Sequence, residues 1–198
     1  MVLVVLMLLL VACGRSRPSR ARVEAEIQEC LIDVSVLPYG WVVAEGPGPY
    51  DLPERVLPGR ALGGVLVAFF QPVLGARADH TLFIYPNKHE AKKEFERQMP
   101  NVFFSAGRLV PWVKINISSF RPAANQMEVR CTVIKGIKGT RIPICTALAQ
   151  YDTILSIFST WSAPGYMSEE DFVHVLQAID ERMKWCLDEK VPQLVPNE

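Results

Sequence analysis

The last long segment of the chain, "SEEDFVHVLQAIDERMKWCLDE" at residues 168–189, constrains the fold most. Its apolar side chains recur every three or four positions, which is the spacing of one helix face. These side chains are Phe172, Val175, Leu176, Ile179, Met183, Cys186 and Leu187. Ser168 stands at the N-cap position, and the acidic residues that follow it stabilise the start of a helix. Such a helix must bury its apolar face against another layer of structure.

Most of the remaining chain has the pattern of β-strands. We expect strands at residues 41–45, 63–71, 80–86, 102–107, 110–120, 126–134, 141–150 and 153–161. Two more amphipathic helices are expected at 23–34 and 87–99, and Pro and Gly residues mark 46–59 as a loop. Pro143 favours an edge position for its strand. This order predicts an α+β fold, in which an antiparallel β-sheet is packed by N-terminal, middle and C-terminal helices.

The size and charge of the chain limit its organisation and its partners. The chain has 198 residues, which fits one domain, and we place that domain at 23–190 with a tail at 191–198. Lys plus Arg and Asp plus Glu both number 21, so the formal net charge is zero. No global field attracts the chain to nucleic acid, and we expect no nucleic-acid partner.

The N-terminal segment has the pattern of an export signal. Residues Val2 to Ala12 are all apolar. This run is far shorter than the roughly 20 residues that cross a bilayer, but it fits the hydrophobic region of a signal peptide. We therefore interpret residues 1–12 as a signal peptide. The Arg- and Ser-rich residues 13–22 that follow are expected to form an extended tether.

The end of this run resembles the lipobox of exported bacterial lipoproteins. It consists of Leu10, Val11, Ala12 and Cys13. The resemblance implies that Cys13 receives a diacylglyceryl group, becomes the mature N-terminus and carries acyl chains such as palmitate. Two acyl chains anchor a protein stably, so we expect a lipid-anchored protein on the extracytoplasmic side of a cell membrane.

The cysteines beyond Cys13 form an even set, which in an oxidising compartment predicts two disulfides. Four cysteines allow three pairings, and spacing alone does not choose among them. Cys131 and Cys145 flank the predicted hairpin tip "KGIKGTR", while Cys30 and Cys186 lie on the apolar faces of the terminal helices. These positions favour Cys131–Cys145 and Cys30–Cys186.

Four blocks of the sequence resemble a known group of domains. The blocks are "CLIDVSVLPYGW", "IYPNKHEAKKEF", "CTALAQYDTILSIFST" and "MSEEDFVHVLQAIDERM", and they are distributed between residues 30 and 183. They are similar to the lipid-anchored, PknH-type extracellular sensor domains of bacteria, which have a PsbP-like α+β fold. The resemblance implies an exported domain that captures an external ligand in a cleft, but it supplies no defined ligand residues.

Aromatic residues are the best candidates for such a cleft, since rings with a polar tip suit ligand sites. The candidates are Tyr39, Trp41, Phe69, Phe70 and Trp112. The stretch "LPYGW" that contains Tyr39 and Trp41 also permits a structural interpretation, with Trp41 as a core anchor after a tight turn.

No pattern of a catalytic or metal site is present in the sequence. His80, His89 and His174 lie outside any HExxH or CxxC context, and there is no G-x-S-x-G, P-loop or G-x-G-x-x-G motif. We therefore expect no metal, no cofactor and no enzymatic activity. The leading prediction is a non-catalytic ligand-binding or sensor domain. The alternatives are a PsbP-like assembly factor that binds an envelope protein and, last, a hydrolase.

Overall fold

The computed structural model describes residues 18–50, 57–105, 108–117, 119–136, 139–162 and 165–195. The predicted signal peptide, the lipobox with Cys13 and residues 14–17 of the predicted tether lie outside the described residues. Within the described ranges, no helix is both long and apolar enough to cross a membrane.

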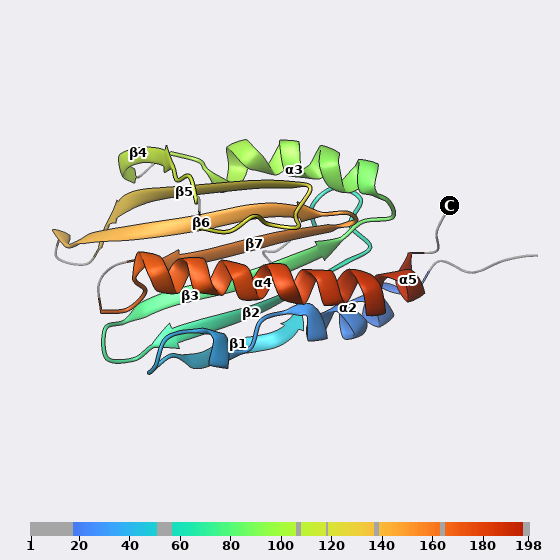
Figure 1. The fold of residues 1–198 in the computed structure, drawn as a ribbon, viewed down its shortest axis with the longest axis horizontal. Coiled ribbons are helices and arrows are strands. Elements are labelled where there is room, and N and C mark those ends of the chain that lie inside the picture. The colour runs from blue at the N-terminus through green and yellow to red at the C-terminus, as the bar shows by residue number, and fades with distance from the viewer. Residues whose placement is uncertain are drawn as a thin grey trace, which may run out of the picture.

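The described residues form a seven-stranded antiparallel sheet, which confirms the predicted α+β fold (Figure 1). The strands are β1 (Val42–Pro49), β2 (Gly63–Gln71), β3 (Ala76–Ile84), β4 (Arg108–Lys114), β5 (Gln126–Lys135), β6 (Arg141–Tyr151) and β7 (Ile154–Trp161). The helices are α2 (Arg20–Ile27), α3 (Lys88–Val102), α4 (Glu169–Glu189) and α5 (Val191–Leu194), with short 3-10 helices at Gln28–Cys30 and Val34–Val36.

The strand order is β1-β2-β3-β7-β6-β5-β4. The first three strands and the last four strands of this order each follow a simple antiparallel path. The pairing of β3 with β7 joins the two halves, so that Asp79 lies opposite Ser159. Residues about eighty positions apart in the sequence thus become neighbours in the middle of the sheet.

One face of the sheet, which we call the α4 face, holds the main core. Here α4 lies over the sheet and runs roughly along the strands, and α2 lies beside its C-terminal end (Figure 1). Alternate strand residues such as Val67, Leu82 and Phe158 are buried against Leu176 and Ile179 of α4. Burial of this apolar area stabilises the fold by about 25 cal/mol per Å².

The opposite face, which we call the α3 face, is covered over only part of its area. Phe83, Leu148 and Leu155 alternate with the residues of the α4 face and pack against Phe95 of α3. Asn87 caps α3, because its side chain accepts a hydrogen bond from the Glu90 N–H at 2.9 Å. The end of the α3 face that includes the start of β3 and the end of β7 lies beyond this helix.

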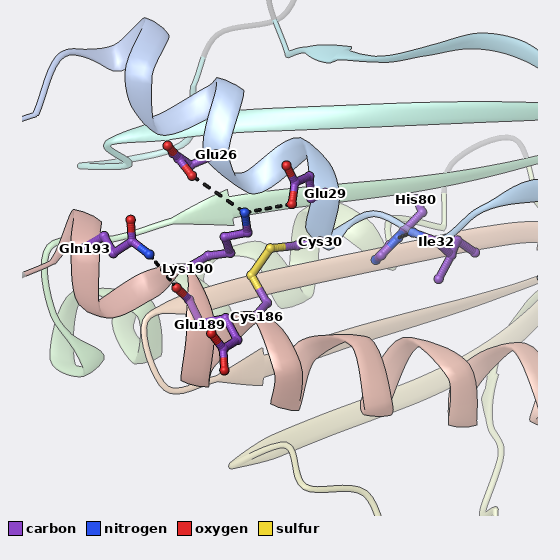
Figure 2. The surroundings of a disulfide bond; sticks show 9 residues. All are labelled: Glu26, Glu29, Cys30, Ile32, His80, Cys186, Glu189, Lys190 and Gln193. Atoms are coloured by element: carbon purple, nitrogen blue, oxygen red, sulfur yellow. Dashed lines mark hydrogen bonds and ion pairs between the residues drawn. A yellow bond between two sulfur atoms is a disulfide. The ribbon is translucent and has the colours of Figure 1, made fainter.

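Both predicted disulfides are present. Cys30–Cys186 joins the turn after α2 to the last turns of α4, and Cys131–Cys145 links β5 to β6 across their ladder. Figure 2 shows the surroundings of the first bridge, where Lys190 lies between Glu29 and Glu26 at 2.7 Å and 3.8 Å. These contacts fix the N-terminal helix to the C-terminal one.

Two predicted elements differ from the structure near α3 and α2. The predicted strand at 102–107 is wrong over its described part, because Val102 ends α3 and the Phe103 N–H donates to the Met99 carbonyl. The predicted helix at 23–34 begins earlier, at Arg20, and its last turn is a 3-10 helix that ends at Cys30.

Two proline-based predictions also need correction. Residues 46–49, predicted as loop, continue β1 at the edge of the sheet, where proline is tolerated. The predicted edge position of Pro143 is wrong, because β6 pairs with both β5 and β7. The pairing of β6 with β7 ends at Ile144 and Trp161, and Pro143 lies one residue beyond this last pair. The N–H that proline lacks therefore falls at the end of the β6–β7 ladder.

Candidate functional site

The five aromatic rings predicted to line one cleft lie in separate parts of the molecule. Trp41 and Phe69 are buried in the core of the α4 face, and the Trp41 indole N–H donates to the Tyr166 carbonyl at 2.9 Å. Tyr39 is fully exposed. Phe70 and Trp112 are half-buried, and Trp112 packs edge-on against Phe103 with ring centroids 5.3 Å apart. These residues do not form a common wall.

A concavity lies instead on the uncovered part of the α3 face. Its volume is about 430 Å³, which is within the usual range for small-molecule sites. Its lining comprises Glu45, Tyr50, Leu66, Ala68, Arg77, Ala78, Asp79, Thr81, Ile144, Ser159, Thr160 and Trp161. A second concavity of about 190 Å³ lies on the α4 face beside β1 and includes Phe69.

A row of paired residues forms the floor of the larger concavity. Cross-strand pairing places Glu45 opposite Ala68, Ala68 opposite Asp79, and Asp79 opposite Ser159. Beyond Ser159 the row continues to Thr146, and the two hydroxyl oxygens are 2.9 Å apart. Adjacent strands are separated by about 4.8 Å, so Asp79, Ser159 and Thr146 present polar groups at this regular step, while Ala68 separates Asp79 from Glu45.

Arg77 and Trp161 form the next row toward the uncovered end. Ala78 of β3 pairs with Thr160 of β7. The next residues along these two strands, Arg77 and Trp161, therefore lie beside each other on the α3 face. Among the described residues, neither the Arg77 guanidinium nor the Trp161 indole N–H has a hydrogen-bond or ion-pair partner, although both line the concavity. This row can therefore donate hydrogen bonds to a ligand in the concavity.

The opposite boundary of the concavity is built by Tyr50. Its ring packs edge-on against Phe83 with centroids 4.9 Å apart, and its backbone N–H donates to the Gly64 carbonyl at 2.7 Å. Tyr50 thus separates the apolar cluster under α3 from the polar floor. An aromatic side chain stands at each end of the concavity, Tyr50 at one and Trp161 at the other.

Charges at the β5 end of the same face are internally balanced. Glu128 accepts hydrogen bonds from Lys114 at 2.6 Å and from Arg130 at 2.8 Å. Partial burial raises the pKa of Glu128, but these two cations outweigh that effect and hold it below its ordinary value. Arg130 also lies over the Phe103 ring, at 4.9 Å from its centroid. In the described part of the chain, Arg77 has no such ion-pair partner, and it is the cation that lines the concavity.

His80 is a core residue on the α4 face. Its Nδ1 accepts the Ile32 N–H at 3.3 Å, so Nε2 carries the proton and donates to the Ser156 hydroxyl at 3.0 Å. Complete burial lowers the pKa of His80 to about 3. The ring is neutral, and Figure 2 shows it beside Ile32. His89 and His174 are exposed on α3 and α4, and the described residues contain no group of three or more His, Cys, Asp or Glu side chains that could hold a metal ion.

The sequence analysis missed Arg77, Asp79, Ser159 and Trp161 as site residues. Period-two alternation alone could have placed Arg77 and Asp79 on the face of β3 opposite to Ala78 and His80. Their proximity to Ser159 and Trp161 depends on the pairing of β3 with β7, for which no local sequence signal exists.

The fold is similar to a known extracellular domain. No protein-family model matches the chain, and no curated protein matches it in sequence. Among solved structures, the extracellular domain of PknH from Mycobacterium tuberculosis matches with a TM-score of 0.50 and 12% sequence identity. The match covers 87% of this chain and 100% of that domain. The chain therefore has a fold similar to that of the PknH extracellular domain.

Proposed function

We propose that this protein is an extracytoplasmic, lipid-anchored domain that binds a small ligand without transforming it. The fold similarity to an extracellular domain, the two disulfides and the lipobox-like segment ending at Cys13 support the location. The concavity on the α3 face supports ligand binding, and this is the observation that carries the proposal.

The concavity has the properties of a binding site. Its floor consists of β-strands in the middle of the sheet, and rigid elements hold ligand-contacting groups more precisely than loops do. Thr81 in the floor is only 5% exposed, and Thr160 at its side only 1%. Arg77 and Trp161 supply the unpartnered donors that orient a ligand.

The test is mass spectrometry of the small molecules that copurify with the full-length protein from its own membranes. Wild type is compared with Trp161→Ala and with Trp185→Ala, a control at a half-buried Trp on α4. We expect at least one species that is enriched with wild type and with the control but lost with Trp161→Ala. Identical small-molecule profiles for all three proteins would contradict the proposal.

The proposed lipid anchor has its own test. Labelled palmitate should enter the wild-type protein and be absent from Cys13→Ala, while globomycin should block processing of the wild type. Label retained in Cys13→Ala would disprove lipidation at this residue.

A second candidate function, docking to an envelope protein, is favoured by apolar side chains at one end of the molecule. Tyr39 is fully exposed and Val73 is 84% exposed in the β2–β3 turn. Gln71 connects the two turns, since its Oε1 accepts the Leu74 N–H at 2.8 Å and its amide lies beside Gly40. A photo-crosslinking residue at Val73 should give a defined protein adduct in intact membranes, and the same residue at exposed Glu181 should not. Equal yields at both positions would count against docking.

A further inference from the structure

The ligand chemistry of the concavity can be inferred from the groups that line it. Glu45, Asp79 and Ser159 share one cross-strand row, and Arg77 and Trp161 lie in the next. Carboxylates only accept hydrogen bonds, guanidinium and indole groups only donate them, and the Ser159 and Thr81 hydroxyls do both. A complementary ligand therefore carries many groups that both donate and accept, and hydroxyl groups have this property.

The charges disfavour an anionic ligand. Among the described residues, the lining holds one cation, Arg77, and two carboxylates, Glu45 and Asp79, both of which also take part in further interactions. A phosphate or carboxylate ligand that reached Arg77 would therefore lie among carboxylates rather than among further cations, and like charges in one site cost free energy. Anion sites are typically built from clusters of Arg or from helix N-termini, and the lining contains neither.

A purely apolar ligand is disfavoured as well. Thr81, Ser159 and Asp79 lie in the middle of the lining, and an acyl chain laid over them would remove water from their polar atoms without replacing its hydrogen bonds. The aliphatic lining residues are Leu66 and Ala68 on β2, Ala78 on β3 and Ile144 on β6. Because the polar residues of β3 and β7 lie between β2 and β6, these aliphatic side chains do not form a continuous apolar channel.

The two aromatic ends of the site match the remaining requirement. Tyr50 and Trp161 both line the concavity. The face of an aromatic ring carries a negative potential, which attracts the weakly positive C–H groups of a sugar ring. The row step of about 4.8 Å, set by the spacing of strands, is comparable with the width of one sugar ring. Polar groups at this step can therefore contact successive rings of an oligosaccharide.

We infer that the concavity on the α3 face binds a neutral oligosaccharide, with Arg77 and Trp161 as its main anchoring residues. This inference rests on the proposed ligand-binding function and gives that ligand a chemical class. Arg77 donates to ring or hydroxyl oxygens, Asp79 accepts from hydroxyl groups, and the aromatic rings cover the apolar faces of the sugar.

The experiment is a titration of the full-length protein, held in a detergent without a sugar headgroup. The neutral probes are maltotriose, cellotriose, mannotriose and chitotriose, and the anionic probes are glucose 6-phosphate and a glucuronic acid disaccharide. Calorimetry gives the affinity, and indole fluorescence reports on Trp161. Arg77→Ala and Trp161→Ala are the test variants, Trp185→Ala is the control, and circular dichroism verifies that each variant is folded.

We expect at least one neutral probe to bind and the anionic probes to bind at least tenfold more weakly. Arg77→Ala and Trp161→Ala should each weaken binding at least tenfold, while Trp185→Ala should stay within twofold of wild type. Absence of binding by all four neutral probes, tighter binding of an anion, or unchanged affinity in both test variants would overturn the inference. If these titrations fail while Trp161→Ala still loses a membrane-derived small molecule, the saccharide inference falls and the proposed function stands.

Discussion

Acidification should destabilise the fold through His80, because protonation of this ring requires the core to open. The ring is fully buried between the Ile32 N–H and the Ser156 hydroxyl. Its third close neighbour is the Phe158 ring, with centroids 6.4 Å apart. None of these neighbours is charged, and burial lowers the pKa of His80 from 6.5 to about 3.

The sign and size of the effect follow from this difference in pKa. Below pH 6.5 the unfolded chain gains a proton on His80 and the folded chain does not, so the free energy of unfolding falls as the pH drops from 6.5 toward 3. The loss attributable to His80 is about 2 kcal/mol at pH 5, because each pH unit below 6.5 contributes about 1.4 kcal/mol. The full contribution is present above pH 6.5.

The assay is guanidinium denaturation, followed by tryptophan fluorescence, of wild type and His80→Gln at several pH values between 5 and 7.5. Glutamine does not titrate, and its amide can donate to Ser156 as the imidazole does. We expect the unfolding free energy of the variant to be lower than that of wild type at pH 7.5 but flatter with pH, so that the gap narrows by about 2 kcal/mol at pH 5. His89→Gln and His174→Gln, at exposed helical positions, are the matched controls.

Equal pH slopes for wild type and His80→Gln would refute this reasoning. That outcome would mean that His80 takes up a proton inside the folded protein. If the unfolding free energy of His89→Gln or His174→Gln also varied less with pH than that of wild type, an exposed histidine would be a source of the pH dependence.

Three further predictions concern stability, each measured by chemical denaturation. Replacing both cysteines of Cys30–Cys186 by Ser should lower the free energy of unfolding by about 5 kcal/mol, because this bridge closes a loop of 156 positions. The same change at Cys131–Cys145, which closes 14 positions, should lower it by about 3 kcal/mol. A larger loss for the shorter loop would contradict the chain-entropy argument. Asp180→Ala should cost about 2 kcal/mol, because the buried carboxylate accepts the Ala123 N–H at 2.7 Å and pairs with Lys184 at 2.9 Å, whereas exposed Glu181→Ala should change stability little. Gly59→Ala should destabilise the fold more than Gly75→Ala does. Both glycines have a positive φ, which costs about 1 kcal/mol for alanine. A Cβ at Gly59 would also collide with the Glu94 carboxylate, whereas a Cβ at Gly75 would face open space. Equal losses in the two glycine variants would show that Glu94 moves aside freely.

The sequence predicts most elements of this fold, because their signals are local. The apolar spacing of α4 and the Ser168 cap both appear in the structure, where Ser168 and Asp171 form a capping box. The failure at 102–107 has a physical reason. Val102, Phe103 and Phe104 form an apolar run without periodicity, so the sequence does not distinguish the end of a helix from a strand. In the fold, Phe103 packs on Trp112, a contact between separate segments that has no local sequence signal.

The candidate site was less accessible from sequence for a related reason. Aromatic type alone selected Trp41 and Phe69, but whether a ring lines a cleft or fills a core depends on which face is covered. The concavity arises where α3 leaves part of its face open and where β3 meets β7. Both features are products of tertiary packing between distant segments.

The Cys30–Cys186 bridge also determines how the domain responds to mechanical load. A pull on the chain ahead of Arg20 first acts on the short segment from Arg20 to Cys30. That segment measures about 35 Å when fully extended, so it can lengthen by only about 20 Å beyond its helical length. The covalent bond then passes force to the end of α4, next to the ion pairs of Lys190 (Figure 2).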